Sequence, residues 1–336
     1  MAQPAQLPDG TIAAHADWSL DARKRWMTVA RLSRGAWRAE APAPVGDLAA
    51  LLPGLLAPGA PVALGLDLPL GLPRDYARHL AEPDFPAFLR GLAARPDFFA
   101  VSATLETVGR DRPFYPARGV RGMTRAAHAA ALGMDGPLGL SRWCDRATAE
   151  RPAGAPLFWT LGANQSGKAA IAAWRDWLLP ALGGAGLPPV ALWPFEGGLH
   201  ALLAPGRAAL AEVYPAEALR QCGLRLPGSK RAQAPRRALG GALRAAMETR
   251  RVLPSPALAA AVADGFGADA AGEDRFDSVV GLLGLVGVLD GARPDFVPDD
   301  PWVRRWEGWV LGQTALPREG AGAAPALPVH RDARSG

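Results

Sequence analysis

Residues Leu64–Pro73 have the sequence Leu-Gly-Leu-Asp-Leu-Pro-Leu-Gly-Leu-Pro, an apolar stretch with a single acid, Asp67, near its centre. The run Val62–Asp67 has the length and composition of a central strand that is covered on both faces. It ends where Pro69 and Gly71 favour a turn. A carboxylate in such a run must be neutral, paired or bound to a cation, because burying it bare is costly. Asp67 is therefore the first candidate site residue.

The segments before this strand indicate an α/β protein. Thr11–Ser19, Arg25–Leu32 and Ala36–Ala41 are predicted strands, and turn-forming residues separate them. Val45–Leu56 is a predicted helix with its apolar side chains on one face. The chain thus begins strand, strand, strand, helix, strand, with Val62–Asp67 as the fourth strand.

A long loop-rich and helical section at about 74–189 is predicted to follow the fourth strand. Further predicted helices are Asn164–Leu182, Pro215–Cys222, Pro235–Thr249 and Glu273–Leu289, and further predicted strands are Val190–Trp193 and Ala209–Tyr214. We expect residues 1–316 to form a single domain that contains this insertion. The segment 317–336, which is rich in Ala, Gly, Pro and charge, is expected to be a disordered tail.

The bulk composition limits the class of protein. The 336 residues are 49% hydrophobic, enough to bury a sizeable core, and the net charge of +5 suits a polyanionic partner. No apolar run is long enough to cross a bilayer, and the N-terminus does not resemble a secretory signal. We therefore expect no membrane partner and a cytoplasmic location. Cys144 and Cys222 are expected to be reduced thiols.

Three more acids interrupt apolar stretches. Asp17 ends the first predicted strand, Glu212 lies in the strand before Tyr214-Pro215, and Asp277 lies near the start of the last predicted helix. Asp274 is one turn earlier, where the helix dipole favours an anion, so a capping role explains it well. Capping explains Asp277 less well. The joint placement of these acids predicts that Asp17 and Asp277 converge with the acid of the fourth strand, with Glu212 adjacent to them.

Five segments, in their order along residues 11–313, resemble the family called domain of unknown function 429, whose members are predicted RNase H-like nucleases. The segments are Asp17–Ser19, Leu66–Pro73, Gly162–Ala169, Glu212–Pro215 and Asp274–Ser278, and Glu307–Gly312 is a weaker sixth. The resemblance implies an RNase H-like fold, with a mixed central sheet flanked by helices and the long insertion between its fourth and fifth strands.

The resemblance also implies a catalytic centre. RNase H-like proteins have carboxylates on the first strand, the fourth strand and a late helix, and Asp17, Asp67 and Asp277 match that layout. Glu212 is an additional acid of a kind that related nucleases sometimes use. Such clusters hold two divalent cations about 4 Å apart, which activate a water and stabilise the leaving oxygen. Mg²⁺ or Mn²⁺ suits a site with only oxygen ligands. The expected reaction is phosphodiester hydrolysis in DNA or RNA.

Two groups of residues are candidates for binding substrate phosphates. The segment from Gly162 to Lys168 resembles a phosphate-binding loop, but Ala169 stands where Ser or Thr would bind Mg²⁺, which disfavours a nucleoside triphosphatase. We expect Gln165 and Lys168, at a helix N-terminus, to contact a phosphate instead. Lys230 and Arg231 begin a basic run that includes Arg236 and Arg237 and could follow a phosphate backbone. A solvated charged surface is the alternative for this run.

Two other functions remain open from the sequence. One is a nucleic-acid-binding protein of the same fold that has lost its metals, although the retention of all four acids argues weakly against it. The other is a phosphoryl-transfer enzyme of the related actin and sugar-kinase type, for which the sequence shows neither a second phosphate loop nor a duplicated half.

Overall fold

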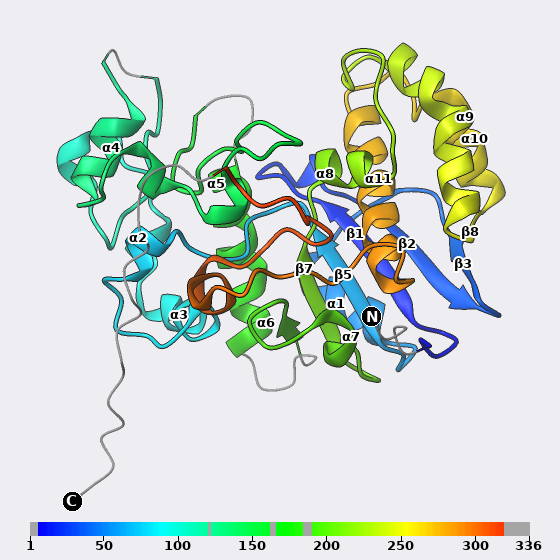
Figure 1. Cartoon of the computed structure of the whole chain (residues 1–336), viewed down its shortest axis with the longest axis horizontal. Helices are drawn as coiled ribbons and strands as arrows, with labels where there is room; N and C mark the ends of the chain where they lie inside the picture. The colour runs from blue at the N-terminus through cyan, green and yellow to red at the C-terminus, as the bar shows by residue number, and fades with distance from the viewer. Residues whose placement is uncertain (1–5, 120–121, 162–165, 184–189, 319–336) are drawn as a thin grey trace, which may run out of the picture. The chain divides into compact units, whose positions relative to one another are not determined.

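The computed structural model describes residues 6–119, 122–161, 166–183 and 190–318 (Figure 1). The chain divides into two compact units. The first contains Met1–Leu68, Ile171–Phe296 and Val310–Thr314, and the second contains Pro69–Ala170, Val297–Trp309 and Ala315–Gly336. The main segment of the second unit overlaps the insertion predicted at about 74–189, and the assignment of residues 1–316 to a single domain stays a prediction.

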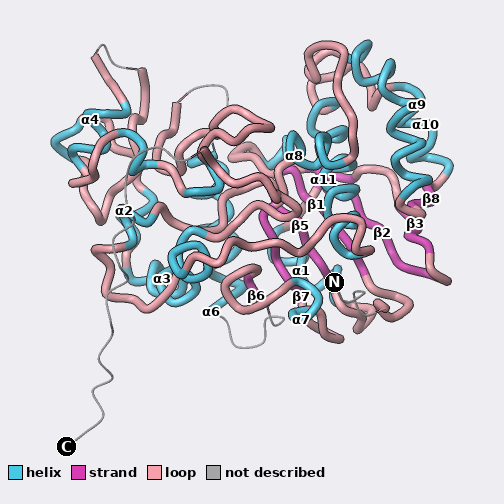
Figure 2. Tube along the Cα trace, viewed as in Figure 1, coloured by secondary structure: helices cyan, strands magenta, loops and turns pink. Residues whose placement is uncertain are grey.

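In the described part of the chain, the first unit is built on a mixed eight-stranded sheet (Figure 2). The strands are β1 (Ile12–Asp17), β2 (Trp26–Ser33), β3 (Ala36–Ala39), β4 (Ala43–Pro44), β5 (Val62–Leu66), β6 (Val190–Leu192), β7 (Ala208–Glu212) and β8 (Val252–Pro254). Their order is β6-β7-β5-β1-β2-β3-β8, and β4 pairs with β2. β1, β2 and β3 are antiparallel, whereas β5 is parallel to β1, and β7 and β6 continue the parallel part.

Helices cover this sheet, as the sequence predicts for an α/β protein. Those of the first unit are α1 (Leu48–Leu56), α6 (Leu179–Gly183), α7 (Leu199–Leu202), α8 (Pro215–Gln221), α9 (Gln233–Thr249), α10 (Pro256–Asp264) and α11 (Gly272–Leu289). A π-helical turn, η7 (Trp174–Leu178), joins α5 (Ser166–Ala173) to α6. The predicted order of strand, strand, strand, helix, strand is confirmed except for the two-residue strand β4, which the structure adds before α1. α1 begins later than predicted because the Asp47 carboxylate accepts the Ala49 N–H at 3.1 Å. The sequence did not predict β4, α7, β8 or α10.

Helix α11 lies across β1 and β2 and fixes where its own N-terminal acids lie (Figure 1). Its glycine Gly281 faces the buried His15 ring of β1 so closely that an added Cβ would lie 2.2 Å from that ring. The Thr28 hydroxyl of β2 is 2.7 Å from the Ser278 hydroxyl, which forms a buried hydrogen bond between sheet and helix. The first turns of α11 are therefore held beside the end of β1. Within the described residues, no helix has both the length and the apolarity needed to cross a membrane.

The second unit is made of short helices around aromatic side chains. Its α-helices are α2 (Arg74–Ala77), α3 (Phe85–Gly91), α4 (Arg125–Ala131) and most of α5; single turns are η2 (Leu92–Ala94), η3 (Pro96–Phe99), η4 (Leu105–Thr107), η5 (Pro137–Leu140), η6 (Trp143–Asp145) and η8 (Val303–Glu307). The rings in its core contact one another and belong to Tyr76, Phe88, Phe98, Phe114 and Phe158.

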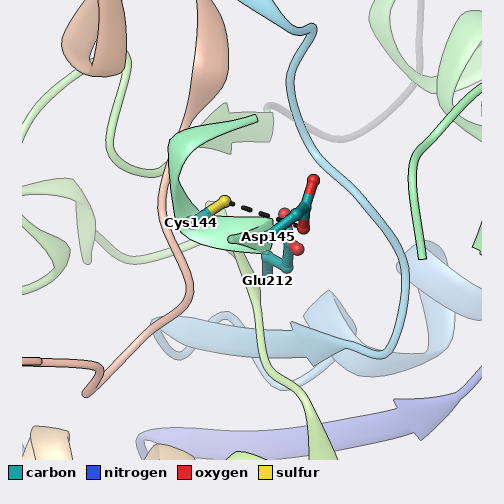
Figure 3. Close-up of side chains that lie close together, drawn as sticks. All are labelled: Cys144, Asp145 and Glu212. Atoms are coloured by element: carbon teal, nitrogen blue, oxygen red, sulfur yellow. Dashed lines mark hydrogen bonds between the residues drawn. The ribbon is translucent and has the colours of Figure 1, made fainter. Parts of the chain in front are cut away.

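Two buried ion pairs stabilise the second unit, one within a single turn and one between distant segments. Arg142 donates to Asp145 at 2.9 Å, and Arg74 donates to Glu307 at 2.6 Å. Beside Asp145, the Cys144 thiol is 3.9 Å from the carboxylate oxygen (Figure 3). Cys144 and Cys222 are both free thiols, as expected.

The segment predicted as a tail begins inside the second unit. Pro317 forms a β-bridge with Thr148, and the Arg318 N–H donates to the Ala147 carbonyl at 3.2 Å. The remainder of the predicted tail, residues 319–336, lies outside the described residues.

Candidate metal centre

Two neighbouring parallel strands bring Asp17 and Asp67 together. Ala16 of β1 pairs with Leu66 of β5, and the Asp67 N–H donates to the Ala16 carbonyl at 3.1 Å. The next residues along the two strands, Asp17 and Asp67, are therefore side by side at the carboxyl ends. His15 faces α11, and side chains two apart on a strand share a face, so Asp17 also faces α11.

The first turns of α11 add two more carboxylates on this face. Asp274 and Asp277 are three residues apart, a spacing that places both on one side of a helix. Burial raises the pKa of Asp17 well above its ordinary value, and the negative charges of Asp277, Asp67 and Asp274 raise it further. Asp17 and Asp277 are only 8% and 5% exposed. The structure thus brings Asp17, Asp67 and Asp277 into one cluster, which we call the acidic cluster and which includes Asp274.

Asp274 is the acid whose part in the cluster the sequence did not reveal. It lies in the first turn of α11, where a capping role was expected, yet no side chain caps this helix. Its Oδ2 is buried and has no hydrogen-bond partner in the described part of the chain. Burial, followed by the charges of Glu273 and Asp277, raises the pKa of Asp274 to about 6.

The other acids of the cluster are also held in an environment that disfavours their ionised form. Burial and the charge of Asp277 raise the pKa of Asp67 to about 7, although Lys230 and a hydrogen bond with Asp17 oppose this rise. Burial also raises the pKa of Asp277, against the opposing charge of Lys230. A proton or a cation relieves this repulsion between carboxylates.

Lys230 is a cation that the chain itself places in this cluster. Its Nζ lies 2.5 Å from Asp277 Oδ2 and 3.2 Å from Glu273 Oε1. Burial alone would lower the pKa of Lys230, but the charges of Asp277, Asp67 and Glu273 hold it above its ordinary value. The predicted phosphate-binding lysine is therefore paired with an acid of the cluster.

Glu212, the fourth predicted acid, ends β7 and is fully buried. It is in register with Leu66, one position before Asp67, so strand alternation directs its side chain to the face opposite that of Asp17 and Asp67. Its charge still contributes to the raised pKa of Asp67. Figure 3 also draws Glu212, which belongs to the first unit, whereas Cys144 and Asp145 belong to the second.

The other residues that were predicted to contact phosphate are Gln165, Lys168 and Arg231. Gln165 is outside the described residues, and Lys168 lies in the first turn of α5 within the second unit, so its role toward the acidic cluster stays a prediction. Arg231 is largely exposed, with its Nε 3.8 Å from Glu273. Arg236, from the same basic run, is buried and donates to the carbonyls of Gly265 and Gly267 in the first unit. It therefore stabilises the fold and does not form a charged surface.

The donor atoms of the acidic cluster suit a hard divalent cation. All four side chains, Asp17, Asp67, Asp274 and Asp277, present carboxylate oxygens, which are the ligands that Mg²⁺ and Mn²⁺ prefer. The buried, unpartnered Oδ2 of Asp274 is an oxygen that a bound cation would satisfy. Among known proteins, no family model matches the chain, and no curated protein and no solved structure shows significant similarity to it.

Proposed function

We propose that the chain is a metal-dependent nuclease of the RNase H-like type that hydrolyses phosphodiester bonds in DNA or RNA. The observation that supports this proposal is the convergence of Asp17, Asp67 and Asp277 from the end of β1, the end of β5 and the start of α11. β5 is the fourth strand of the sequence prediction, since β4 spans only two residues. The carboxylates thus fall on the elements that the RNase H-like resemblance implies.

In this proposal Asp17, Asp67, Asp274 and Asp277 surround the binding site of Mg²⁺ or Mn²⁺, an ion that would supply an activated water and stabilise the leaving oxygen. With a pKa of about 7, Asp67 is about half protonated at neutral pH, and a bound cation would displace this proton. Asp274, with a pKa of about 6, is mostly ionised there. Lys230 offsets part of the remaining negative charge, so that a phosphodiester anion can approach. Glu212 is left outside this set because its side chain is directed to the other face of the sheet. A nucleic-acid substrate and two free thiols fit a cytoplasmic location.

A cleavage assay tests the proposal. End-labelled single-stranded and duplex DNA and RNA would be incubated with the full chain in chelator, in Mg²⁺ and in Mn²⁺. We expect products only with a divalent cation, and none with Asp17→Asn. Asp135→Asn, which removes one charge from a side chain that is 86% exposed, is the matched control and should cleave like the unmodified protein.

A non-catalytic nucleic-acid-binding protein is the second candidate, and the ion pair between Lys230 and Asp277 favours it, because a lysine already neutralises one acid of the cluster. Binding of the labelled strands that is independent of divalent cations, without cleavage in any of the tested conditions, would decide for this candidate.

A further inference from the structure

Lys230 differs from an ordinary surface lysine because two acids from one helix hold its ammonium group. Asp277 is at 2.5 Å and Glu273 at 3.2 Å, and these residues lie one turn apart on α11. The charge of Lys230 also acts on Asp17, Asp67 and Asp274, in each case lowering a pKa that burial raises. The ammonium group is therefore an electrostatic member of the acidic cluster.

A buried arginine fixes the backbone that carries this lysine. The Arg236 guanidinium is 1% exposed and donates to the Lys230 carbonyl, to the Gly265 carbonyl at 2.9 Å and to the Gly267 carbonyl at 2.6 Å. It also packs on Gly272, the first residue of α11, where an added Cβ would lie 2.3 Å from the guanidinium. Arg236 thus ties the Lys230 loop to the helix that bears Asp274 and Asp277.

A second cation beside Asp277 would have to share this place with a fixed positive charge. Like charges a few ångströms apart repel by several kcal/mol even at an effective dielectric constant of about 20. The carboxylates of Asp17 and Asp67 have no such lysine at salt-bridge distance among the described residues, and Asp274 has an unpartnered oxygen. One divalent ion can therefore bind to these three acids, while Lys230 keeps Asp277 neutralised.

We propose that Lys230 takes the place of one of the two cations expected in an RNase H-like centre, so that the chain binds a single divalent ion. This inference rests on the proposed function and specifies its metal content. In this proposal Lys230 is a positioning residue whose ammonium group permanently neutralises Asp277. The exchangeable ion is held by Asp17, Asp67 and Asp274.

The number of bound ions tests this inference without any activity measurement. The full chain would be titrated with Mn²⁺, and the free ion would be followed by its electron paramagnetic resonance signal. We expect one tight Mn²⁺ per chain in the unmodified protein and in Lys230→Arg, which keeps the charge. Lys230→Met removes the charge but retains the length of the side chain, so a second Mn²⁺ should bind and the first should bind about tenfold more tightly. Arg231→Met, which removes the neighbouring and mostly exposed charge, should leave one ion.

The possible results separate the two proposals. Two tight Mn²⁺ ions in the unmodified protein would overturn the inference and leave the nuclease proposal standing. One ion with unchanged affinity in both the unmodified protein and Lys230→Met would also overturn it, because the lysine would then not compete with a cation. No Mn²⁺ binding by the unmodified protein would remove the metal-dependent function itself. If Lys230→Met does not fold, Lys230→Gln removes the same charge and replaces it in the titration, with the same expected and contradicting results.

Discussion

Asp17 is buried beside three other carboxylates, so its negative charge is unfavourable whenever no cation is bound. Asp17→Asn removes this charge with little change in shape. We expect the variant to melt in chelator at the same temperature as the unmodified protein or higher. A hundredfold excess of Mn²⁺ over its dissociation constant should add about 2.7 kcal/mol to the unmodified protein, a shift of several degrees, and Asp17→Asn should lose most of it. Lower stability in chelator, with no metal effect in either protein, would instead make Asp17 a structural residue.

Asp274 provides a second test at the level of one residue. If its unpartnered Oδ2 is a cation ligand, Asp274→Asn should weaken Mn²⁺ binding about tenfold or more, because one carboxylate ligand is lost. Calorimetric titration would measure the affinity. Asp264→Asn changes an acid of the same unit that is 53% exposed and ion-paired with Arg237, and it should not alter the affinity. Equal affinities in both variants would place Asp274 outside the metal centre.

Some members of the acidic cluster could be predicted from the sequence, and others could not. Asp17 and Asp67 could be found because each stands where an apolar strand ends, and parallel strands place such ends together. Asp274 could not be separated from a helix-terminal acid, since a first-turn position explains it equally well. The pairing of Lys230 with Asp277 depends on the path of a loop and on Arg236, which no local pattern encodes.

At the scale of the element, the acidic cluster depends on how closely α11 approaches β1. Gly281→Ala would place a Cβ 2.2 Å from the buried His15 ring, so helix or ring must move. We expect a loss of about 1–3 kcal/mol in unfolding free energy, as for other overpacked cores, together with weaker Mn²⁺ binding. Gly241→Ala in α9 is the matched control, because a Cβ there meets nothing within 4 Å. It should raise stability by about 0.5–1 kcal/mol. Chemical denaturation of both variants measures the difference, and a neutral Gly281→Ala would contradict the packing argument.

The elements of the first unit that the sequence did not predict, β4, α7, β8 and α10, are short or weakly patterned. β8 has three residues, one of them proline, and gains its strand character only from pairing with β3. α10 is rich in alanine and has little amphipathic pattern, but the residues at its two ends are typical of a helix start and a helix end. Ser255 caps it, Pro256 is its first residue and Gly265, with φ of 72°, ends it. The strands β1, β2 and β3 and the helix α1 were predicted because their apolar residues recur regularly.

At the scale of the whole molecule, the division into two units could not be predicted from the sequence. The second unit joins Pro69–Ala170 to Val297–Trp309, and its ion pair between Arg74 and Glu307 spans 233 residues. Such a pairing depends on packing between segments whose local patterns are independent of each other. The sequence predicted only that the section after the fourth strand would be loop-rich and helical.

The pH dependence of stability is also a property of the whole chain, because acids and histidines contribute with opposite signs. Burial lowers the pKa of His15 and of His128 from 6.5 to about 4, so these histidines favour the folded state increasingly as pH rises to 6.5 and have no further effect above it. Asp67 acts in the opposite direction. Its pKa rises from 3.8 to about 7 on folding, so the folded protein binds the extra proton, and this contribution to stability is lost as pH rises through 7.

In chelator, we therefore expect the melting temperature of the unmodified protein to fall between pH 6.5 and about pH 8, where the histidines no longer contribute and Asp67 ionises next to its neighbours. With excess Mn²⁺ the fall should be smaller or reversed, since the ion binds only the deprotonated carboxylates and gains affinity as they ionise. Asp67→Asn cannot ionise at this position, so its melting temperature in chelator should change less over the same interval. Thermal melts at closely spaced pH values measure the three melting-temperature curves: the unmodified protein in chelator, the unmodified protein in Mn²⁺, and Asp67→Asn in chelator. A melting temperature that rises through this interval in chelator would show that Asp67 ionises without cost, and the electrostatic account of the acidic cluster would then be wrong.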